Sequence, residues 1–128
     1  MDILIESTRQ FEKDMSNLTD KERLYVVNKI NDYVNSFSEH KKVLYQKLRR
    51  IPLNIPNLDK YDSSLYTMRI GKDLRIIITI DEDPIFEQII FTLFRVVKFK
   101  DLRKAYLGIA ESLYQDLKRE NKELLSVS

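Results

Sequence analysis

Apolar and polar residues alternate with two different periods along this chain, and the period changes between residues 50 and 65. Before the change, apolar residues recur at helical spacing, which predicts a helix with one apolar stripe. The stripe, in which Asn31 is the polar exception, consists of Leu24, Val27, Ile30, Asn31, Val34 and Phe37. A stripe of this kind is buried by packing on another element, and we expect that element to be a sheet.

Polar residues ahead of the helical segments predict where the helices begin. Ser7 with Gln10, and Thr19 with Glu22, fit the capping box, in which two side chains satisfy backbone amides that lack a helical partner. The short aliphatic run from Ile3 to Ile5 precedes the first of these starts and predicts an opening strand. The second helix should end before Pro52, because the residue before a proline avoids helical geometry.

After the change, segments rich in β-branched and aromatic residues alternate with turn residues. The predicted strands are Leu65 to Ile70, Leu74 to Ile80 and Glu87 to Val97, and the predicted turns are Gly71 to Asp73 and Asp81 to Pro84. Short turns between strands predict an antiparallel meander. From Leu102 the period becomes helical again, with Asp101 as N-cap. The apolar stripe of this last helix is Leu102, Ala105, Tyr106, Ile109, Leu113 and Leu117.

This order of elements predicts an α+β fold, in which an N-terminal strand and two helices pack on an antiparallel sheet and a C-terminal helix follows. One face of the sheet is then covered and the other is open for function. The chain has 128 residues, of which 43% are hydrophobic, so we expect one domain over residues 1–128 with a substantial core. Within it, Phe86, Phe91, Phe94 and Tyr114 are expected to be core residues, and Asp81, Glu82 and Asp83 a solvated turn.

The composition excludes several classes of site. The chain has no cysteine and one histidine, His40, so neither disulfides nor a histidine or thiolate zinc site can form, and we expect no metal and no cofactor. The first residues contain no signal peptide and no apolar run is long enough to cross a bilayer, so a cytoplasmic protein without a membrane partner is expected. The 22 Lys and Arg residues are nearly balanced by 20 Asp and Glu residues, so any nucleic-acid binding must come from cations that cluster together.

Clustered cations are present around the end of the third predicted strand of the meander. Arg75 is predicted in the middle of the sheet, on the face opposite the aliphatic side chains of its own strand. Taken alone, Arg75 is most simply a solvated residue. The strand end and the following helix add Arg95, Lys98, Lys100, Arg103 and Lys104 around Asp101, with Tyr106 after them. A second basic segment, Lys41 to Arg50, includes Lys47, Arg49 and Arg50 beside Tyr45. It suits RNA phosphate contacts and base stacking, and equally an exposed helix end.

In the order and spacing of these segments, the chain resembles the RelE/ParE superfamily of toxins from bacterial type II toxin–antitoxin pairs. The resemblance extends from about Asp2 to Leu113. It depends on the opening strand, the helical ESTRQFEKDMSNLTDKERLYVVNKI, KLRR before the predicted loop from Ile51 to Ser64, LYTMRIGKDLRIIITIDED and FRVVKFKDLRKAY. The most typical features are Arg75, three residues after a Gly-Lys turn, and the cationic stretch from Lys98 to Tyr106.

The resemblance implies a ribosome-dependent endoribonuclease that enters the A site and cleaves mRNA by attack of the RNA 2′-hydroxyl, without a metal. Arg75 would hold the phosphate, Lys100 would stabilise it or donate a proton, and Tyr106 would stack on or orient the substrate; Arg69 is the fourth candidate catalytic residue. The candidate nucleic-acid-binding residues are Lys47, Arg49, Arg50, Arg95, Lys98, Arg103 and Lys104. The implied partners are a cognate antitoxin, the ribosome and mRNA.

The sequence also departs from the family pattern. The strand Leu65 to Ile70 offers only Tyr66, Thr67 and Arg69 where active relatives carry lysines or a glutamate, and arginine is a poor general base because its pKa is above about 12. A ParE-like gyrase inhibitor and a catalytically silent binding or regulatory protein are therefore the alternatives. One observation separates the two classes. Arg69, Arg75 and Lys100 around one concavity with Tyr106 at its rim would favour the nuclease, and scattered positions would favour binding alone.

Overall fold

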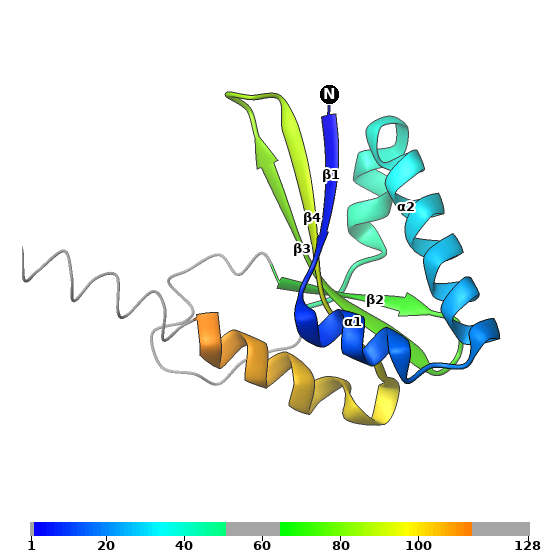
Figure 1. Cartoon of the computed structure of the whole chain (residues 1–128). Helices are drawn as coiled ribbons and strands as arrows, with labels where there is room; N and C mark the ends of the chain where they lie inside the picture. The colour runs from blue at the N-terminus through cyan, green and yellow to red at the C-terminus, as the bar shows by residue number, and fades with distance from the viewer. Residues whose placement is uncertain (1, 51–64, 114–128) are drawn as a thin grey trace, which may run out of the picture.

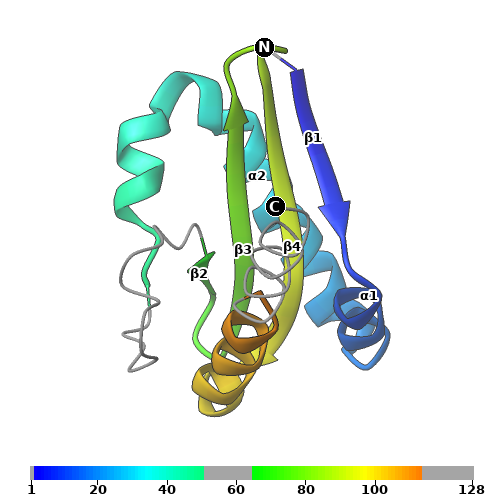
Figure 2. The ribbon, with the colours of Figure 1, turned by 90° about the vertical axis from the view of Figure 1, so that its left-hand side faces the viewer.

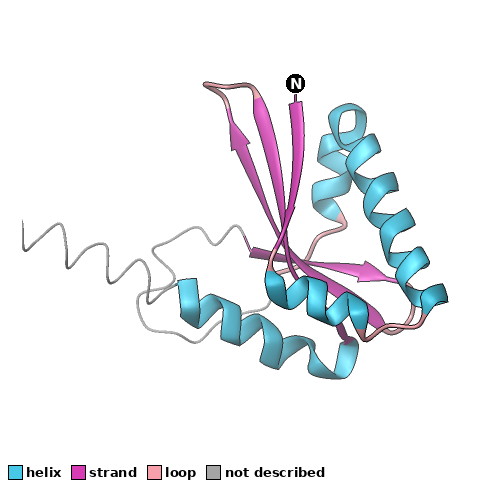
Figure 3. Cartoon of the chain, viewed as in Figure 1, coloured by secondary structure: helices cyan, strands magenta, loops and turns pink. Residues whose placement is uncertain are grey.

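The computed structural model describes residues 2–50 and 65–113, which form an α+β arrangement in the predicted order (Figure 1). The elements are β1 (Asp2–Ser7), α1 (Arg9–Ser16), α2 (Asp20–Gln46), β2 (Leu65–Ile70), β3 (Leu74–Asp83), β4 (Gln88–Lys98), the 3-10 turn η2 (Phe99–Asp101) and a C-terminal helix described over residues 102–113. Helices lie on both sides of the strands (Figure 3). The predicted α+β class is therefore confirmed. The predicted core residue Tyr114 lies outside the described residues.

The sheet is mixed and not wholly antiparallel. Its strand order is β1-β4-β3-β2. The predicted meander of β2, β3 and β4 is antiparallel throughout, whereas β1 pairs with β4 in parallel, from Asp2 opposite Gln88 to Ser7 opposite Leu93. Alternating apolar residues predict that a segment is a strand, but they do not predict whether it runs parallel or antiparallel to its neighbour, because it buries the same residues in either direction. The direction of β1 therefore appears only in the folded chain.

The two N-terminal helices begin with different caps. The predicted capping box of α2 is present: the Thr19 hydroxyl accepts a hydrogen bond from the Glu22 amide, and the Glu22 carboxylate accepts one from the Thr19 amide. In α1 the cap is Thr8 and not Ser7, because Ser7 is the last residue of β1. The Thr8 hydroxyl accepts from the Phe11 amide at 3.1 Å and donates to the Phe94 carbonyl at 2.8 Å, which joins α1 to β4.

The first core lies between α2 and one face of the sheet. The buried residues of α2 are Val26, Ile30, Tyr33, Val34, Phe37 and Leu44. The buried face of α2 is therefore rotated about the helix axis from the predicted stripe, since Leu24 and Val27 are 63% and 40% exposed. The Phe91 ring from β4 lies edge-on to the Tyr33 and Phe37 rings, with centroids 6.2 and 5.1 Å apart. The helix is kinked at His40, where the backbone is not helical.

A second core lies on the opposite face of the sheet. From the sequence, we expected this face to be open. There the C-terminal helix crosses β3 and β4 near the end of the sheet that leads to η2 (Figure 2). The buried residues of this core are Leu65, Ile77, Val97, Leu102, Ala105, Tyr106 and Ala110. Part of the face that was expected to carry function is therefore occupied by packing.

The β3–β4 hairpin differs from the prediction at its turn. Asp81, Glu82 and Asp83 are strand residues that pair with β4, and the turn follows them at residues 84–87. At this turn the Asp83 carboxylate accepts hydrogen bonds from the amides of Ile85 and Phe86. Phe86, a predicted core residue, is 71% exposed, whereas Phe91 is fully buried as predicted. Further along β4 the register shifts between Ile77 and Ile78 of β3, which leaves Phe94 as the extra residue of a bulge.

Candidate nucleic-acid interface

Arg69 and Arg75 lie directly opposite each other in the β2–β3 ladder. Residues in opposite positions present their side chains on the same face, with Cβ atoms roughly 5 Å apart. Each guanidinium is held by main-chain oxygens of the adjoining turn: Arg69 Nε donates to the Gly71 carbonyl at 2.8 Å, and Arg75 Nη1 donates to the Leu74 carbonyl at 2.9 Å. The Arg75 guanidinium also lies over the Phe99 ring, 4.7 Å from its centroid.

The end of β4 brings further cations to the same end of the sheet. Lys98 pairs with Leu74, and the Phe99 amide donates to the Asp73 carbonyl at 2.7 Å, so η2 runs beside the β2–β3 turn. Lys72, Lys98 and Lys100 are exposed there. We call Arg69, Lys72, Arg75, Lys98 and Lys100 the cationic sheet end. All of these residues except Lys72 were candidates from the sequence.

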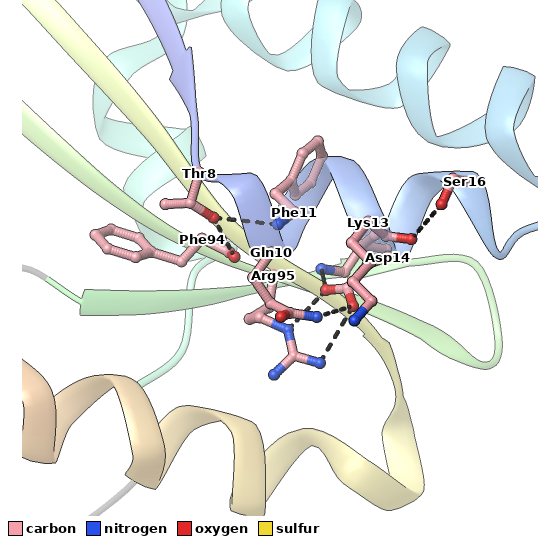
Figure 4. A network of polar contacts seen from close by, with 9 residues as sticks. Thr8, Gln10, Phe11, Lys13, Asp14, Ser16, Phe94 and Arg95 are labelled. Carbon is pink, nitrogen blue, oxygen red and sulfur yellow. Dashed lines mark hydrogen bonds and ion pairs between the residues drawn. The ribbon is translucent and has the colours of Figure 1, made fainter.

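Arg95 has a structural role in place of the predicted contact with nucleic acid. Its guanidinium pairs with Asp14 of α1, with Nε 2.7 Å from Oδ2 and a second contact of 3.2 Å (Figure 4). The same carboxylate accepts hydrogen bonds from the Val96 amide and from Gln10. Asp14 is 81 residues away in sequence, so no local pattern could have identified it as the partner of Arg95. A guanidinium neutralised in this way is a weak candidate for binding phosphate.

Tyr106 is part of the second core and does not reach the surface. Its side chain is 1% exposed, and its hydroxyl donates to the Leu65 carbonyl at 2.8 Å. The sequence placed Tyr106 both on the apolar stripe of its helix and at a substrate site. The structure places it on the stripe, because the C-terminal helix packs on the strand that Leu65 begins. In this arrangement Tyr106 does not stack on a substrate base.

The remaining predicted cations occupy separate places. Arg103 and Lys104 are exposed on the C-terminal helix, and Lys104 lines a groove of about 830 Å³ between that helix, α1 and the end of β4. Arg95 and Lys98 line the same groove, together with the acids Asp14 and Asp101, so its charge is mixed.

Arg50, the last described residue before the gap, contacts the ring of Tyr66. Its Nη2 donates to the Tyr66 hydroxyl at 2.8 Å, and its guanidinium lies 4.8 Å from the ring centroid. Tyr66 in turn lies edge-on to Tyr45, with ring centroids 6.0 Å apart. Burial, followed by the charge of Glu82, raises the pKa of Tyr45 to about 12, so its hydroxyl stays protonated at neutral pH.

A second groove, of about 660 Å³, lies between α2 and the edge strand β2, and we call it the α2 groove. It is lined by Lys29, Asp32, Tyr33, Ser36, Leu44, Lys47, Arg49, Met68, Arg69, Ile70, Gly71 and Lys72. Lys47, Arg49 and Arg69 were candidates from the sequence. Lys29 and Lys72 were missed, because Lys29 comes from the middle of α2 and no spacing rule connects it with β2.

The sequence left open whether the predicted catalytic residues surround one concavity, as a nuclease would need, or are scattered, as in a protein that only binds. Of the three cations among them, Arg69 lines the α2 groove, whereas Arg75 and Lys100 line neither this groove nor the one beside α1. Tyr106 is at no rim because it is buried. Arg75 and Lys100 do share one end of the sheet with Arg69. The arrangement therefore suits contacts with several phosphates along a surface more than the enclosure of one reacting group.

Among residues 2–50 and 65–113 there is no group of His, Asp and Glu side chains that could bind a metal ion. Within the same residues, no helix combines the length and apolar character needed to cross a bilayer. Of the four predicted catalytic residues, two are arginines, which do not accept protons near neutral pH, and Tyr106 is buried.

Comparisons with known proteins give only weak similarity in structure. No protein-family model matches the sequence, and no curated protein matches it. The structure is similar to the crystal structure of the toxin–antitoxin complex RelBE2 from Mycobacterium tuberculosis, with a TM-score of 0.45 and 12% sequence identity. The match covers 77% of this chain and 99% of that chain. A similarity at this level transfers no activity, ligand or partner.

Proposed function

We propose that this chain is the toxin of a toxin–antitoxin pair and that it acts by binding RNA through the cationic sheet end. The observation that carries the proposal is the direct opposition of Arg69 and Arg75 across β2 and β3. Like charges in opposite positions of a ladder repel each other, so placing these two charges together lowers the stability of the fold. An anion between or above the two guanidiniums would remove the repulsion, and RNA supplies such anions at every phosphodiester.

The local geometry supports a phosphate contact at Arg75. Its guanidinium donates to the Leu74 carbonyl and lies over the Phe99 ring. Arginine has five N–H donors in a planar fork, so the donors not used in these contacts remain for a phosphate. Lys98 and Lys100 are exposed near Arg75 and would contact neighbouring phosphates as mobile point charges.

Cleavage of the bound RNA is the second candidate function, and the fixed position of Arg75 favours it. A guanidinium that is already held in place stabilises charge that develops on a reacting phosphate without reorganising. In this mechanism the RNA 2′-hydroxyl attacks the adjacent phosphate on the ribosome, Arg75 holds the phosphate, and Lys100 donates to the leaving 5′-oxygen. The cations Arg69, Arg75 and Lys100 carry no proton acceptor, so the acceptor for the 2′-hydroxyl proton is unassigned, and this is why binding is the primary proposal.

The proposed partner is a small antitoxin with an acidic segment that covers the same cations. Opposite potentials on the two surfaces would speed association and align the complex. Such a segment would compete with RNA for the cationic sheet end, so the antitoxin would act by exclusion. Co-purification of the product of a neighbouring short reading frame, released by high salt, would test this part of the proposal.

RNA binding is tested by fluorescence anisotropy with a labelled single-stranded oligonucleotide and with ribosomes. Arg75→Gln should weaken binding about tenfold or more, since a charge-assisted hydrogen bond is lost. Lys13→Ala is the control, because Lys13 is exposed on α1 and belongs neither to the cationic sheet end nor to the basic segment Lys41 to Arg50. Equal binding by wild type and Arg75→Gln would remove the cationic sheet end from the proposal.

Cleavage is tested separately with programmed ribosomes, followed by primer extension on the mRNA. If the chain is a nuclease, Arg75→Gln should reduce the cleavage rate on the order of 100- to 1000-fold, the usual effect of losing one preorganised charge. RNA binding without cleavage by the wild type would leave the binding toxin as the function. A wild type that binds neither RNA nor ribosomes would refute both, and inhibition of gyrase would then be measured.

A further inference from the structure

The α2 groove is distinct from the contacts of Arg75 although it adjoins them. Its walls come from the middle of α2, the end of α2 and the edge strand β2 with its turn. Arg75, Phe99 and Lys100 do not line it, whereas Arg69 does. Arg69 therefore belongs to the cationic sheet end and to the α2 groove at once, since it lies opposite Arg75 and is one of the residues that line the groove.

The charge of the groove is strongly positive. Its cations are Lys29, Lys47, Arg49, Arg69 and Lys72, and its one acid is Asp32. Within the described parts of the chain, no ion pair joins any of these cations to an acid. Among the described residues, the repulsion between these cations is therefore not relieved by an ion pair, and an anionic ligand would be attracted to the groove.

Two of the cations are held by main-chain atoms in a way that leaves donors for a ligand. Arg49 Nη1 donates to the Gln46 carbonyl at 2.7 Å, where α2 ends, and Arg69 Nε donates to the Gly71 carbonyl at 2.8 Å. The other N–H groups of both guanidiniums form the fork that binds phosphate in a bidentate manner. Lys29 is restrained differently, with its ammonium 5.6 Å from the centroid of the Tyr25 ring.

The floor of the groove is apolar. It includes the buried side chains of Tyr33, Leu44, Met68 and Ile70. The Tyr33 hydroxyl donates to the Leu44 carbonyl at 3.0 Å, so the polar end of this side chain is already bonded within the protein. Because its polar atom is already hydrogen-bonded within the protein, this floor suits a flat, apolar group of a ligand. Together with the cations at the rim, it suits a ligand that carries such a group and a phosphate.

Asp32 and Ser36 distinguish between the two classes of ligand that combine negative charge with apolar surface. A nucleotide has hydroxyl and amino groups that can donate to the Asp32 carboxylate and to Ser36. An acidic peptide has carboxylates, which Asp32 repels. We propose that the α2 groove binds a nucleotide unit of single-stranded RNA, with the base on the apolar floor and the phosphate on Arg49, Arg69 and the lysines.

This inference rests on the proposed RNA-binding function and assigns it a second contact. RNA held at Arg75 would pass over Arg69 into the α2 groove, so that consecutive nucleotides contact both places. The groove then adds affinity by contacting a base, whereas the cationic sheet end contacts only phosphates. Its volume of about 660 Å³ leaves room for one nucleotide with solvent around it.

Titration with adenosine 5′-monophosphate, followed by NMR of the backbone amides, tests the groove directly. The wild type should show shifts at the lining residues, and inorganic phosphate should bind about tenfold more weakly because it has no base to place on the floor. Lys29→Ala combined with Lys72→Ala should weaken the nucleotide about tenfold or more. Lys13→Ala, on α1 and outside the groove, should leave the affinity unchanged.

Failure of the groove and failure of the proposed function give different results. Arg75→Gln should lose affinity for RNA and keep affinity for the mononucleotide, because Arg75 does not line the groove. The groove proposal is overturned if the mononucleotide shifts no lining residue, if phosphate binds equally well, or if a hexaglutamate peptide binds there more tightly than the nucleotide. If instead the mononucleotide binds in the groove while Arg75→Gln leaves RNA binding intact, the groove is supported and the role of the sheet end fails.

Discussion

Arg69 and Arg75 face each other across β2 and β3, and both guanidiniums donate to carbonyl groups of residues 71–74. This turn therefore fixes two positive charges side by side at the end of the sheet. We predict a repulsive coupling of about 0.2–1 kcal/mol between them, the usual range for like charges in opposite positions.

A double-mutant cycle with Arg69→Gln, Arg75→Gln and the double variant would measure this coupling from denaturant unfolding. The cycle cancels the loss of each separate hydrogen bond to the main chain. The coupling should shrink as salt is raised, because exposed charges are screened. An attractive coupling, or one that does not respond to salt, would contradict the prediction.

Gly71 and Gly108 should respond in opposite directions to the same change. Gly71 has φ of +67°, and a Cβ there would lie 3.3 Å from the Tyr25 ring. Gly71→Ala should therefore cost about 1–2 kcal/mol of unfolding free energy. Gly108 is an exposed residue of the C-terminal helix, and apart from its chain neighbours and the backbone of its own helix nothing lies within 4 Å of where a Cβ would be. Gly108→Ala should gain about 0.5–1 kcal/mol. Thermal melting of both variants would check the opposite signs.

The pair between Asp14 and Arg95 should matter for stability and not for RNA. Asp14→Ala removes the acceptor for Arg95, Gln10 and the Val96 amide, so the free energy of unfolding should fall by about 1–3 kcal/mol. Asp20→Ala is the control, because that carboxylate is fully exposed and its pair with Arg23 should contribute little. Urea unfolding of the two variants tests the contrast, and equal midpoints would show that the network adds no stability.

Tyr106→Phe should separate packing from any contact with substrate. The change removes the hydrogen bond to the Leu65 carbonyl, which should lower the unfolding free energy by about 1 kcal/mol. Affinity for RNA should stay unchanged because the side chain is buried. Anisotropy and melting measured on the same preparation give both values. A loss of RNA affinity without a loss of stability would show that the hydroxyl reaches the ligand.

Tyr45 should make the protein sensitive to alkali. Its pKa is raised from 10.0 to about 12, first by burial and then by the charge of Glu82. The folded state therefore holds this proton more tightly than the unfolded state, so the contribution is complete below pH 10 and is lost as the pH rises towards 12. Tyr45→Phe should flatten the fall in melting temperature over this window. A fall of the same steepness in both proteins would assign the effect to other groups.

Where the structure depends on contacts between near neighbours, the sequence already predicted it. The capping box of Thr19 and Glu22 joins residues three apart, and the turn at Gly71 joins strands that follow each other directly. For the same reason the sequence could predict the α+β class, the strand Leu65–Ile70 and the cations around η2. Local hydrogen bonds and alternating burial leave their pattern within a few residues of sequence.

Contacts between distant segments were decided only by the tertiary structure. Helical spacing allowed several stripes on α2, and packing against Phe91 selected the one with Tyr33 and Phe37 and left Leu24 exposed. The partner of Arg95, the direction of β1 and the meeting of Lys29 with β2 in one groove likewise join residues far apart in the chain. Such contacts form where the whole chain buries the most apolar surface, and that optimum has no local signature.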